Sequence, residues 1–215
     1  MKNVDFCTFG VKLGMTQILD NFGNLVPVTI VSQPKPCVIT RVTTSLNSQQ
    51  KLIIQIGCYS DFRANKPTIG YFKKQSVPNL RYLHEFQTYK NNEYQVGKSL
   101  DLKELDQQLV QVSAYTIGKG FAGYQKKHKF SRGAMSHGSK SHRRPGSIGA
   151  GTTPGRVFPG VKMAGRLGFS RRSIKNLLVL KVDLTNKLFL LKGSVPGKYG
   201  NLLLVSLKKT NYFLD

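Results

Sequence analysis

The chain has 215 residues, with 33 Lys and Arg against 10 Asp and Glu, which gives a formal net charge of +23. Self-repulsion of this size disfavours a free compact protein, so the composition predicts a polyanionic partner, with nucleic acid ahead of an anionic membrane surface. No run of 18 apolar residues is present, which excludes a membrane-spanning helix. The length suits one or two compact domains.

The start of the chain and its cysteines bear on where the protein works. The first 17 residues contain no long apolar run and no small-residue cleavage site, so we expect the protein to work where it is made or after loss of a presequence. Cys7, Cys37 and Cys58 are isolated and have apolar neighbours. An odd number of cysteines without CxxC spacing indicates neither a disulfide framework nor a zinc site, and predicts reduced, buried thiols in a reducing compartment.

The first part of the chain has the pattern of a β protein. The sequence QILDNFGNLVPVTIV (17–31) places a turn at 20–24 between two apolar runs, which predicts a β-hairpin. CVITRVTT (37–44) and KLIIQIGCYS (51–60) are β-branched runs of strand length. Residues 66–86 break this rhythm, and we predict a short helix or two there, within a small insertion at about 61–86.

The middle of the chain is cationic and lacks a core. A strand pattern, LVQVSAYTI, ends at residue 117; residues 107–182 contain 15 Lys and Arg and no Asp or Glu, and 12 of the 21 glycines lie within 118–168. Between Lys126 and Gly160, burial of the few large apolar residues returns about 15 kcal/mol at most, whereas ordering the backbone costs about 35–70 kcal/mol. We therefore predict that this segment is disordered unless a partner supplies contacts.

The C-terminal part returns to the β pattern. Residues 176–197 repeat the hairpin signal around a turn at 183–186, and NLLLVSL (201–207) follows as a further strand. Many short strands with Gly, Pro and Asn turns predict a mainly β fold: a small β-barrel with a short helical insertion and a long irregular basic extension. The predicted domains are a barrel at 1–118 and 169–215, with the insertion at about 61–86, and an extended loop at 119–168.

Two glycine-rich stretches match nucleotide-binding motifs only in spacing. GKGFAG (118–123) has the dinucleotide-binding pattern, but no acid that would bind the ribose follows before Asp183. GSIGAGTT (146–153) has Walker spacing, but Thr152 stands where the phosphate-binding lysine is required. The glycines are therefore interpreted as sites of sharp turns and close backbone approach.

The histidines of the extension favour RNA contact over catalysis. His128, His137 and His142 lie among Lys and Arg, which repel a metal cation, and no nearby acid can complete a hydrolase triad. Imidazole rings suit phosphate contact or stacking on bases. The sequence thus predicts no enzyme, no cofactor, no metal site and no small-molecule substrate.

Nucleic-acid binding explains these features together. Lys and Arg neutralise phosphates, Gly, Ser and Thr let the backbone approach closely, and aromatic rings among the charges offer stacking faces. Tyr124, Phe130 and Phe158 are predicted to stack or pack. The predicted RNA-binding residues are Lys119, Lys126, Lys127, His128, Lys129, Arg132, His137, Lys140, His142, Arg143, Arg144, Thr152, Thr153, Arg156, Lys162, Arg166, Arg171 and Arg172.

Four motifs, in order over nearly the whole chain, resemble a known family. They are GVKLGMTQ (10–17), GKGFAGYQKKHKFSRGAMSHGSKSHR (118–143), PGSIGAGTTPGRVFPGVKMAGRLG (145–168) and LLKGSVPG (190–197), and they resemble the universal large-subunit ribosomal protein family called L-three. GAGTTPGRVFPG is similar to the plastid and cyanobacterial branch. Frequent Asn, Lys, Ile, Phe and Tyr suit a plastid-encoded copy in the chloroplast stroma, with the bacterial cytoplasm or a mitochondrial copy as alternatives.

The resemblance implies a function. It implies a barrel of the translation-protein type with an extension at about 120–168, and the tip of this extension, at about 147–153, approaches the peptidyl-transferase region. It also implies direct binding near the 3′ end of 23S-type rRNA early in assembly. Neighbouring large-subunit proteins are expected to pack on the barrel. Many bacterial members carry a methylated glutamine three residues after the glycine matching Gly149; Thr152 stands there, so that modification is not expected. The alternative is a free basic RNA-binding or chaperone-like module.

Overall fold

The computed structural model describes residues 6–20, 22–45, 48–61, 63–89 and 94–207. The chain divides into two compact units, and each is described separately. The first, the barrel unit, comprises Met1–Tyr115 and Arg171–Asp215; the second, the arm, comprises Thr116–Ser170.

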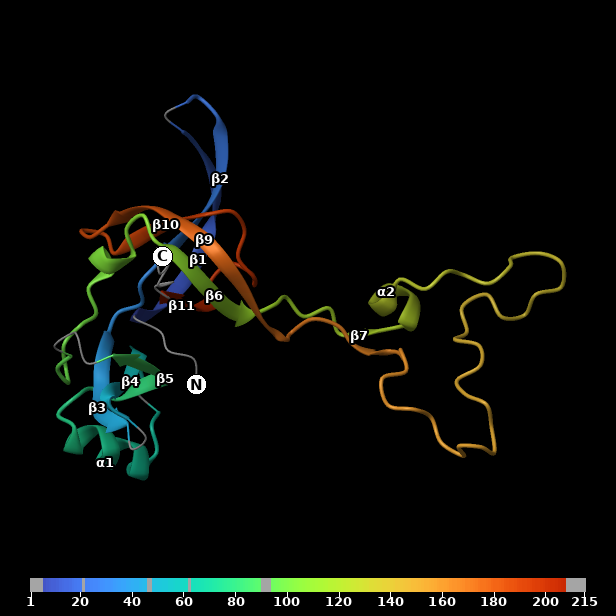
Figure 1. Cartoon of the computed structure of the whole chain (residues 1–215), viewed down its shortest axis with the longest axis horizontal. Helices are drawn as coiled ribbons and strands as arrows, with labels where there is room; N and C mark the ends of the chain where they lie inside the picture. The colour runs from blue at the N-terminus through green and yellow to red at the C-terminus, as the bar shows by residue number, and fades with distance from the viewer. Residues whose placement is uncertain (1–5, 21, 46–47, 62, 90–93, 208–215) are drawn as a thin grey trace, which may run out of the picture. The chain divides into compact units, whose positions relative to one another are not determined.

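A closed ring of six strands forms the centre of the barrel unit (Figure 1). All neighbouring strands are antiparallel, and β1 pairs with both β11 and β2, which completes the ring. Side chains alternate between the two faces of each strand, so that every second residue of β11 is buried. The prediction of a mainly β chain is confirmed. In ring order the strands are β1 (Phe6–Leu19), β11 (Leu202–Leu207), β6 (Leu109–Tyr115), β9 (Arg171–Asp183), β10 (Leu188–Lys192) and β2 (Leu25–Ser32).

Both predicted hairpins are confirmed. Hydrogen bonds among a few adjacent residues of each turn determine where they form. Between β1 and β2, the N–H of Asp20 donates to the carbonyl of Asn24 at 2.9 Å; Asn21 of this turn lies outside the described residues. Between β9 and β10, one Asp183 carboxylate oxygen accepts the backbone N–H groups of Thr185 and Asn186, at 2.9 and 3.3 Å. Hydrogen bonds from Asn186 lower the pKa of Asp183 below its ordinary value.

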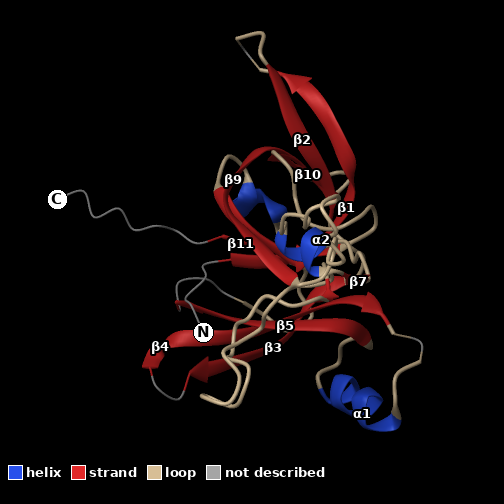
Figure 2. Cartoon of the chain, turned by 90° about the vertical axis from the view of Figure 1, so that its right-hand side faces the viewer, coloured by secondary structure: helices blue, strands red, loops and turns tan. Residues whose placement is uncertain are grey.

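The predicted strands near residues 37–44 and 51–60 exist, but they do not belong to the barrel. As β3 (Cys37–Ser45) and β4 (Ser48–Ser60), they form a separate three-stranded sheet with β5 (Leu80–Tyr89). The predicted helical insertion is helical only in its first half, where α1 spans Lys66–Lys74 (Figure 2). Its second half becomes β5, which pairs antiparallel with β4. Pairing with another strand of the sheet is not visible in the local sequence pattern from which the helix was predicted.

The barrel and the three-stranded sheet share one apolar core. Phe6, Phe189 and Leu203 of the barrel belong to the same buried cluster as Ile54 and Ile56 of β4. The short helix η1 (Leu102–Leu105) adds two buried leucines to this core. The helix α1 contributes Phe72 to a smaller cluster.

The three cysteines are free and buried in the same core, as predicted. Burial raises the pKa of Cys7 and Cys37 above the ordinary thiol value, and raises that of Cys58 to about 12. A group whose pKa is raised by folding stabilises the fold below its unfolded pKa and loses that contribution as pH rises. The thiols therefore stabilise the native state at neutral pH and favour unfolding above about pH 8.5.

Two phenylalanines provide a matched test of the core. Phe189 is fully buried, whereas Phe22 is 86% exposed. Phe189→Ala should lower the free energy of unfolding by about 3–5 kcal/mol, because it removes a buried ring and leaves a cavity. Phe22→Ala should change it by about 0.5 kcal/mol at most. Urea unfolding followed by circular dichroism measures both, and an equal effect of the two changes would contradict the assigned core.

Candidate nucleic-acid interface

The base of the arm is held by its own backbone. The short strands β7 (Phe121–Ala122) and β8 (Gly165–Arg166) pair antiparallel. The N–H of Lys119 donates to the carbonyl of Leu167 at 2.8 Å, and the N–H of Leu167 donates to the carbonyl of Gly120 at 2.9 Å. We call residues 116–130 and 163–170 the stem, and residues 131–162 the loop.

A short helix completes the stem. The helix α2 spans Tyr124–His128 and ends at Lys129, whose φ of 60° is left-handed. Tyr124 is buried and its ring centroid lies 5.5 Å from that of Phe130. The Nε2 atom of His128 lies 2.9 Å from the carbonyl oxygen of Met163 and therefore ties the outgoing chain to the returning one.

At the foot of the stem, where residues 117–120 run beside residues 167–168, the backbone geometry requires a glycine. Gly168 has a φ of +74°, and a Cβ atom there would collide with the carbonyl oxygen of Ile117. Only glycine adopts this conformation without strain and also leaves that space open. The close approach of the two chains at the foot therefore depends on Gly168.

The loop has little internal structure. The backbone N–H of Gly133 donates to the carbonyl of His142 at 3.0 Å, and the Nδ1 atom of His142 lies 2.8 Å from the carbonyl of Ala134. Two further backbone hydrogen bonds within the loop close single turns, from Ser139 to Ser136 at 3.3 Å and from Gly155 to Gly151 at 3.1 Å. From residue 143 to residue 164 every residue is exposed, and no helix or strand occurs. Such a segment has no core of its own to stabilise it.

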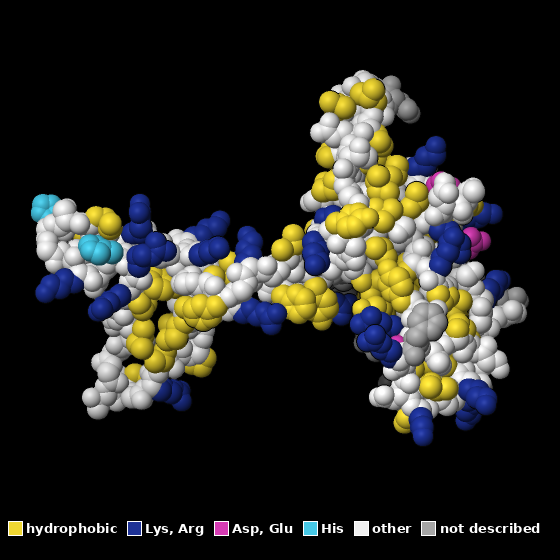
Figure 3. Space-filling view, turned by 180° about the vertical axis from the view of Figure 1, so that it is seen from behind, with side chains coloured by type: hydrophobic (Ala, Val, Ile, Leu, Met, Phe, Trp, Pro, Cys, Tyr) yellow, Lys and Arg dark blue, Asp and Glu magenta, His cyan; other side chains and the backbone are white. Residues whose placement is uncertain are grey.

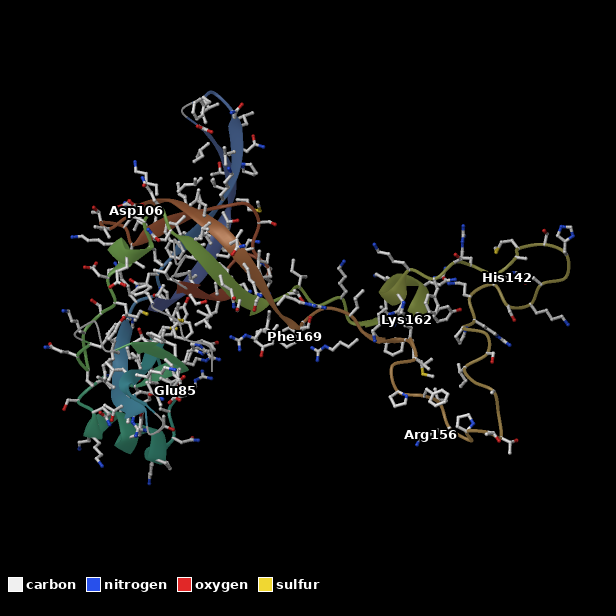
Figure 4. The ribbon with its side chains drawn as sticks, viewed as in Figure 1. Glu85, Asp106, His142, Arg156, Lys162 and Phe169 are labelled. Atoms are coloured by element: carbon white, nitrogen blue, oxygen red, sulfur yellow. The ribbon has the colours of Figure 1, made fainter. Side chains whose placement is uncertain are left out.

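The predicted RNA-binding residues fall on three parts of the chain, and all are exposed except the partly buried Lys127, His128 and His142. Figure 3 shows Lys and Arg side chains along the arm, and Figure 4 labels His142, Arg156 and Lys162 on it. The stem carries Lys119, Lys126, Lys127, His128, Lys129 and Arg166; the loop carries Arg132, His137, Lys140, His142, Arg143, Arg144, Thr152, Thr153, Arg156 and Lys162; and β9 of the barrel unit carries Arg171 and Arg172.

The aromatic residues divide between packing and exposure. Tyr124 packs inside the stem, and Phe130 rests against it with 37% of its surface exposed. Phe158 is 57% exposed in the loop, so its ring is accessible to a base. The Oη atom of Tyr124 and the Nε2 atom of Gln125 are buried without a hydrogen-bond partner among the described residues.

Three features of this surface were not predicted from the sequence. Apolar side chains follow one another along the returning part of the arm, with exposures of 40–57%. The guanidinium carbon of Arg166 lies 4.8 Å from the ring centroid of Phe169, a cation–π contact that was not predicted. Lys175, exposed on β9 beyond Arg171 and Arg172, was also omitted, although its charge was a visible signal. Besides Phe158, which was predicted, the apolar residues of the first feature are Ile148, Val157, Val161 and Met163.

Two features are absent from the described part of the chain. No group of three His, Cys, Asp or Glu side chains there is placed to hold a metal ion. No helix in that part is long and apolar enough to cross a membrane.

The fold and the surface define a basic β-barrel protein with a cationic arm that lacks a core. Residues 96–189 match the family model described as Ribosomal protein L3. Large ribosomal subunit protein uL3c of Porphyra purpurea is 48% identical over 201 residues, which cover 92% of this chain and 97% of that protein. Protein uL3 of Trichormus variabilis is 50% identical over 198 residues, covering 90% and 92%. The chain therefore belongs to the ribosomal protein L3 family, the predicted L-three family, whose members are structural and not enzymes.

Plastid and cyanobacterial proteins both occur among these relatives. Protein uL3c of Cyanophora paradoxa is 47% identical over 200 residues, which cover 92% of this chain and 95% of that protein. The predicted similarity to the plastid and cyanobacterial branch is thus confirmed.

Gly168→Ala should open the foot of the stem, because its Cβ atom would force Ile117 away. We expect faster amide exchange at Lys119 and Leu167, whose N–H groups form the stem hydrogen bonds. Gly149→Ala is the matched control, since nothing lies within 4 Å of its added Cβ atom. Hydrogen exchange measured by NMR on the full chain checks both, and unchanged exchange in Gly168→Ala would show that the foot does not need glycine.

Proposed function

We propose that the chain is a structural protein of the large ribosomal subunit and binds large-subunit rRNA directly. In this proposal its barrel, of the translation-protein type, binds near the 3′ end of 23S-type rRNA and helps to nucleate assembly of the subunit. The arm extends toward the peptidyl-transferase region. The names of the relatives, large ribosomal subunit proteins, support the assignment to that subunit.

The exposed run from residue 143 to residue 164 carries the proposal. It contains Arg143, Arg144, Arg156 and Lys162 and no acid, and it makes no helix or strand. Backbone ordering costs about 1–2 kcal/mol per residue, which this run cannot recover from burial within the chain. A polyanion with a shaped surface would supply both the countercharge and the packing, and folded RNA has both.

Stem and loop have different parts in this function. The stem is organised by its own hydrogen bonds and by the contact of His128 with Met163. It therefore holds the two ends of the loop together without any contact from RNA. Basic side chains of the loop would neutralise phosphates, while exposed Phe158 and its apolar neighbours would stack on or pack against bases. His128 is better explained as a brace of the stem than as an RNA contact.

The proposed compartment is the plastid stroma, where the protein would reside in the ribosome beside neighbouring large-subunit proteins. Its support is the occurrence of uL3c proteins among the relatives. Cyanobacterial relatives of similar identity keep the bacterial cytoplasm as the alternative compartment.

Residence in the particle separates this function from that of a free RNA-binding or chaperone-like module. Sedimentation of ribosomal particles through a high-salt gradient should leave the protein in the large subunit, at one copy per particle. Release of the protein to the top of the gradient would favour the free module. Quantitative mass spectrometry of the gradient fractions measures the ratio.

Two adjacent arginines allow the electrostatic contribution to be measured. Arg143→Gln with Arg144→Gln should weaken rRNA binding and flatten the slope of log K against log salt by about 1.4–1.8, since each phosphate contact contributes about 0.7–0.9. Lys98→Gln with Lys103→Gln removes the same charge from exposed sites near Asp101 and Glu104. This control should leave the slope nearly unchanged. Filter binding of the full chain from 50 to 200 mM salt measures both, and equal slopes for the two variants would contradict the assignment of the loop.

A further inference from the structure

A turn at one end of the barrel holds an aromatic ring in solvent. Residues 193–201 lead from β10 into β11, and Tyr199 lies among them with 73% of its surface exposed. The N–H of Asn201 donates to the carbonyl of Lys198 at 3.2 Å and closes a four-residue turn, which we call the Tyr199 turn. Its third residue, Gly200, has a φ of +74°, as a type II turn requires. Tyr199 is therefore the second residue of a tight turn, and its ring stays outside the core.

Lys12 of β1 fixes the backbone of this turn. Its Nζ atom donates to the carbonyl oxygens of Val195 and Gly197, both at 3.0 Å. Its backbone N–H donates to the carbonyl of Asn201 at 3.0 Å, and its carbonyl accepts the N–H of Gly200 at 2.8 Å. These bonds join two motifs of the sequence, GVKLGMTQ and LLKGSVPG, that play no part in the proposed function. Because its ammonium group is engaged with carbonyls, Lys12 is better explained as a brace of the turn than as a cation offered to phosphates.

The Tyr199 turn is also tied to β6. The Nδ2 atom of Asn201 donates to the carbonyl of Tyr115, the last residue of that strand, at 3.1 Å. A Cβ atom at Gly197, whose φ is +97°, would collide with the side chain of Asn201, so the chain is closely packed on itself here. The backbone that carries Tyr199 is thus fixed by two strands before any partner arrives. An aromatic ring on a fixed backbone loses less entropy when a partner stacks on it.

This end of the barrel carries cations and lacks acids. β6 ends beside Arg171 and Arg172 of β9, which lie two strands and about 10 Å from β11. Both arginines and Lys198 are exposed. Acids occur instead at the opposite ends of the same strands, where Asp106 precedes β6 and Asp183 ends β9. The segments that form the cationic end, none of which contains Asp or Glu, are 9–14, 112–115, 171–174 and 195–202.

We propose that Tyr199 is a stacking site for one unpaired base of large-subunit rRNA. The base lies on the exposed ring, Lys198 meets the phosphate of the same nucleotide, and Arg171 neutralises a phosphate further along the strand. Every base offers a π face, and exposed rings among cations are typical of sites for single-stranded nucleic acid. The site belongs to the barrel unit and not to the arm. This inference rests on the proposed function, since the base belongs to the rRNA that the barrel unit is proposed to bind.

Lys12→Met tests whether the turn must be braced for the ring to bind. It should weaken rRNA binding of the chain that has Tyr199 but hardly change that of the Tyr199→Ala chain, since Lys12 acts through the turn. It should also leave the slope of log K against log salt unchanged, whereas Lys198→Gln should flatten that slope by about 0.7–0.9, the contribution of one phosphate contact. Circular dichroism establishes that each variant is folded. Equal losses with and without the Tyr199 ring, or a flattened slope for Lys12→Met, would overturn the role of Lys12 as a brace.

Three changes of the ring test the stacking itself, in filter binding of the full chain to large-subunit rRNA. Tyr199→Ala should weaken binding about 5- to 150-fold, the factor expected from loss of one base stacked on an aromatic ring. Tyr199→Phe keeps the ring and should bind within about twofold of the unchanged chain. Tyr199→Leu keeps apolar bulk without a π face and should bind as weakly as Tyr199→Ala.

Each outcome has a defined meaning. Full binding by Tyr199→Leu would indicate apolar packing in place of base stacking, and would overturn the site. Full binding by Tyr199→Ala would overturn it too, and the proposed function would still stand if Arg143→Gln with Arg144→Gln weakens binding. Failure of the unchanged chain to bind rRNA, or its absence from the large subunit, counts against the proposed function itself.

Discussion

The separation of apolar residues from positive charge along the chain is the constraint on which the structure depends. The barrel unit receives nearly all of the buried side chains, whereas the arm contributes only Ala122 and Tyr124 to the buried apolar set. The arm lies wholly within the stretch 107–182, which has no acid to offset its Lys and Arg. One part of the chain can therefore be stabilised by its own core, and the other needs an external countercharge.

The stem connects the self-stabilised part of the chain to the loop, which has no core of its own. Hydrogen bonds between Lys119, Gly120 and Leu167, together with the His128 contact to Met163, fix where the loop leaves and returns. Ordering the foot of a long segment in advance lowers the entropy that a partner must overcome on binding. The loop beyond it remains free to follow the surface of that partner.

Local signals in the sequence predicted what local chemistry determines. Asp20 and Asp183 were placed correctly in turns, because a turn depends on a few adjacent residues. The separate sheet of β3, β4 and β5 was missed, since strand pairing between distant segments leaves no local signal. The cations of the arm were evident from charge alone. The bracing role of His128 was not, because its partner Met163 is 35 residues away.

Amide hydrogen exchange of the full chain, free and then assembled into the large subunit, tests most directly whether the loop needs its partner. In the free protein we expect protected amides in the barrel strands and at Lys119 and Leu167, and fast exchange across residues 143–164. In the assembled particle the same loop residues should become protected. Protection of residues 143–164 in the free protein would show that the arm folds without RNA, and would contradict the division between a self-stabilised barrel and a partner-stabilised loop.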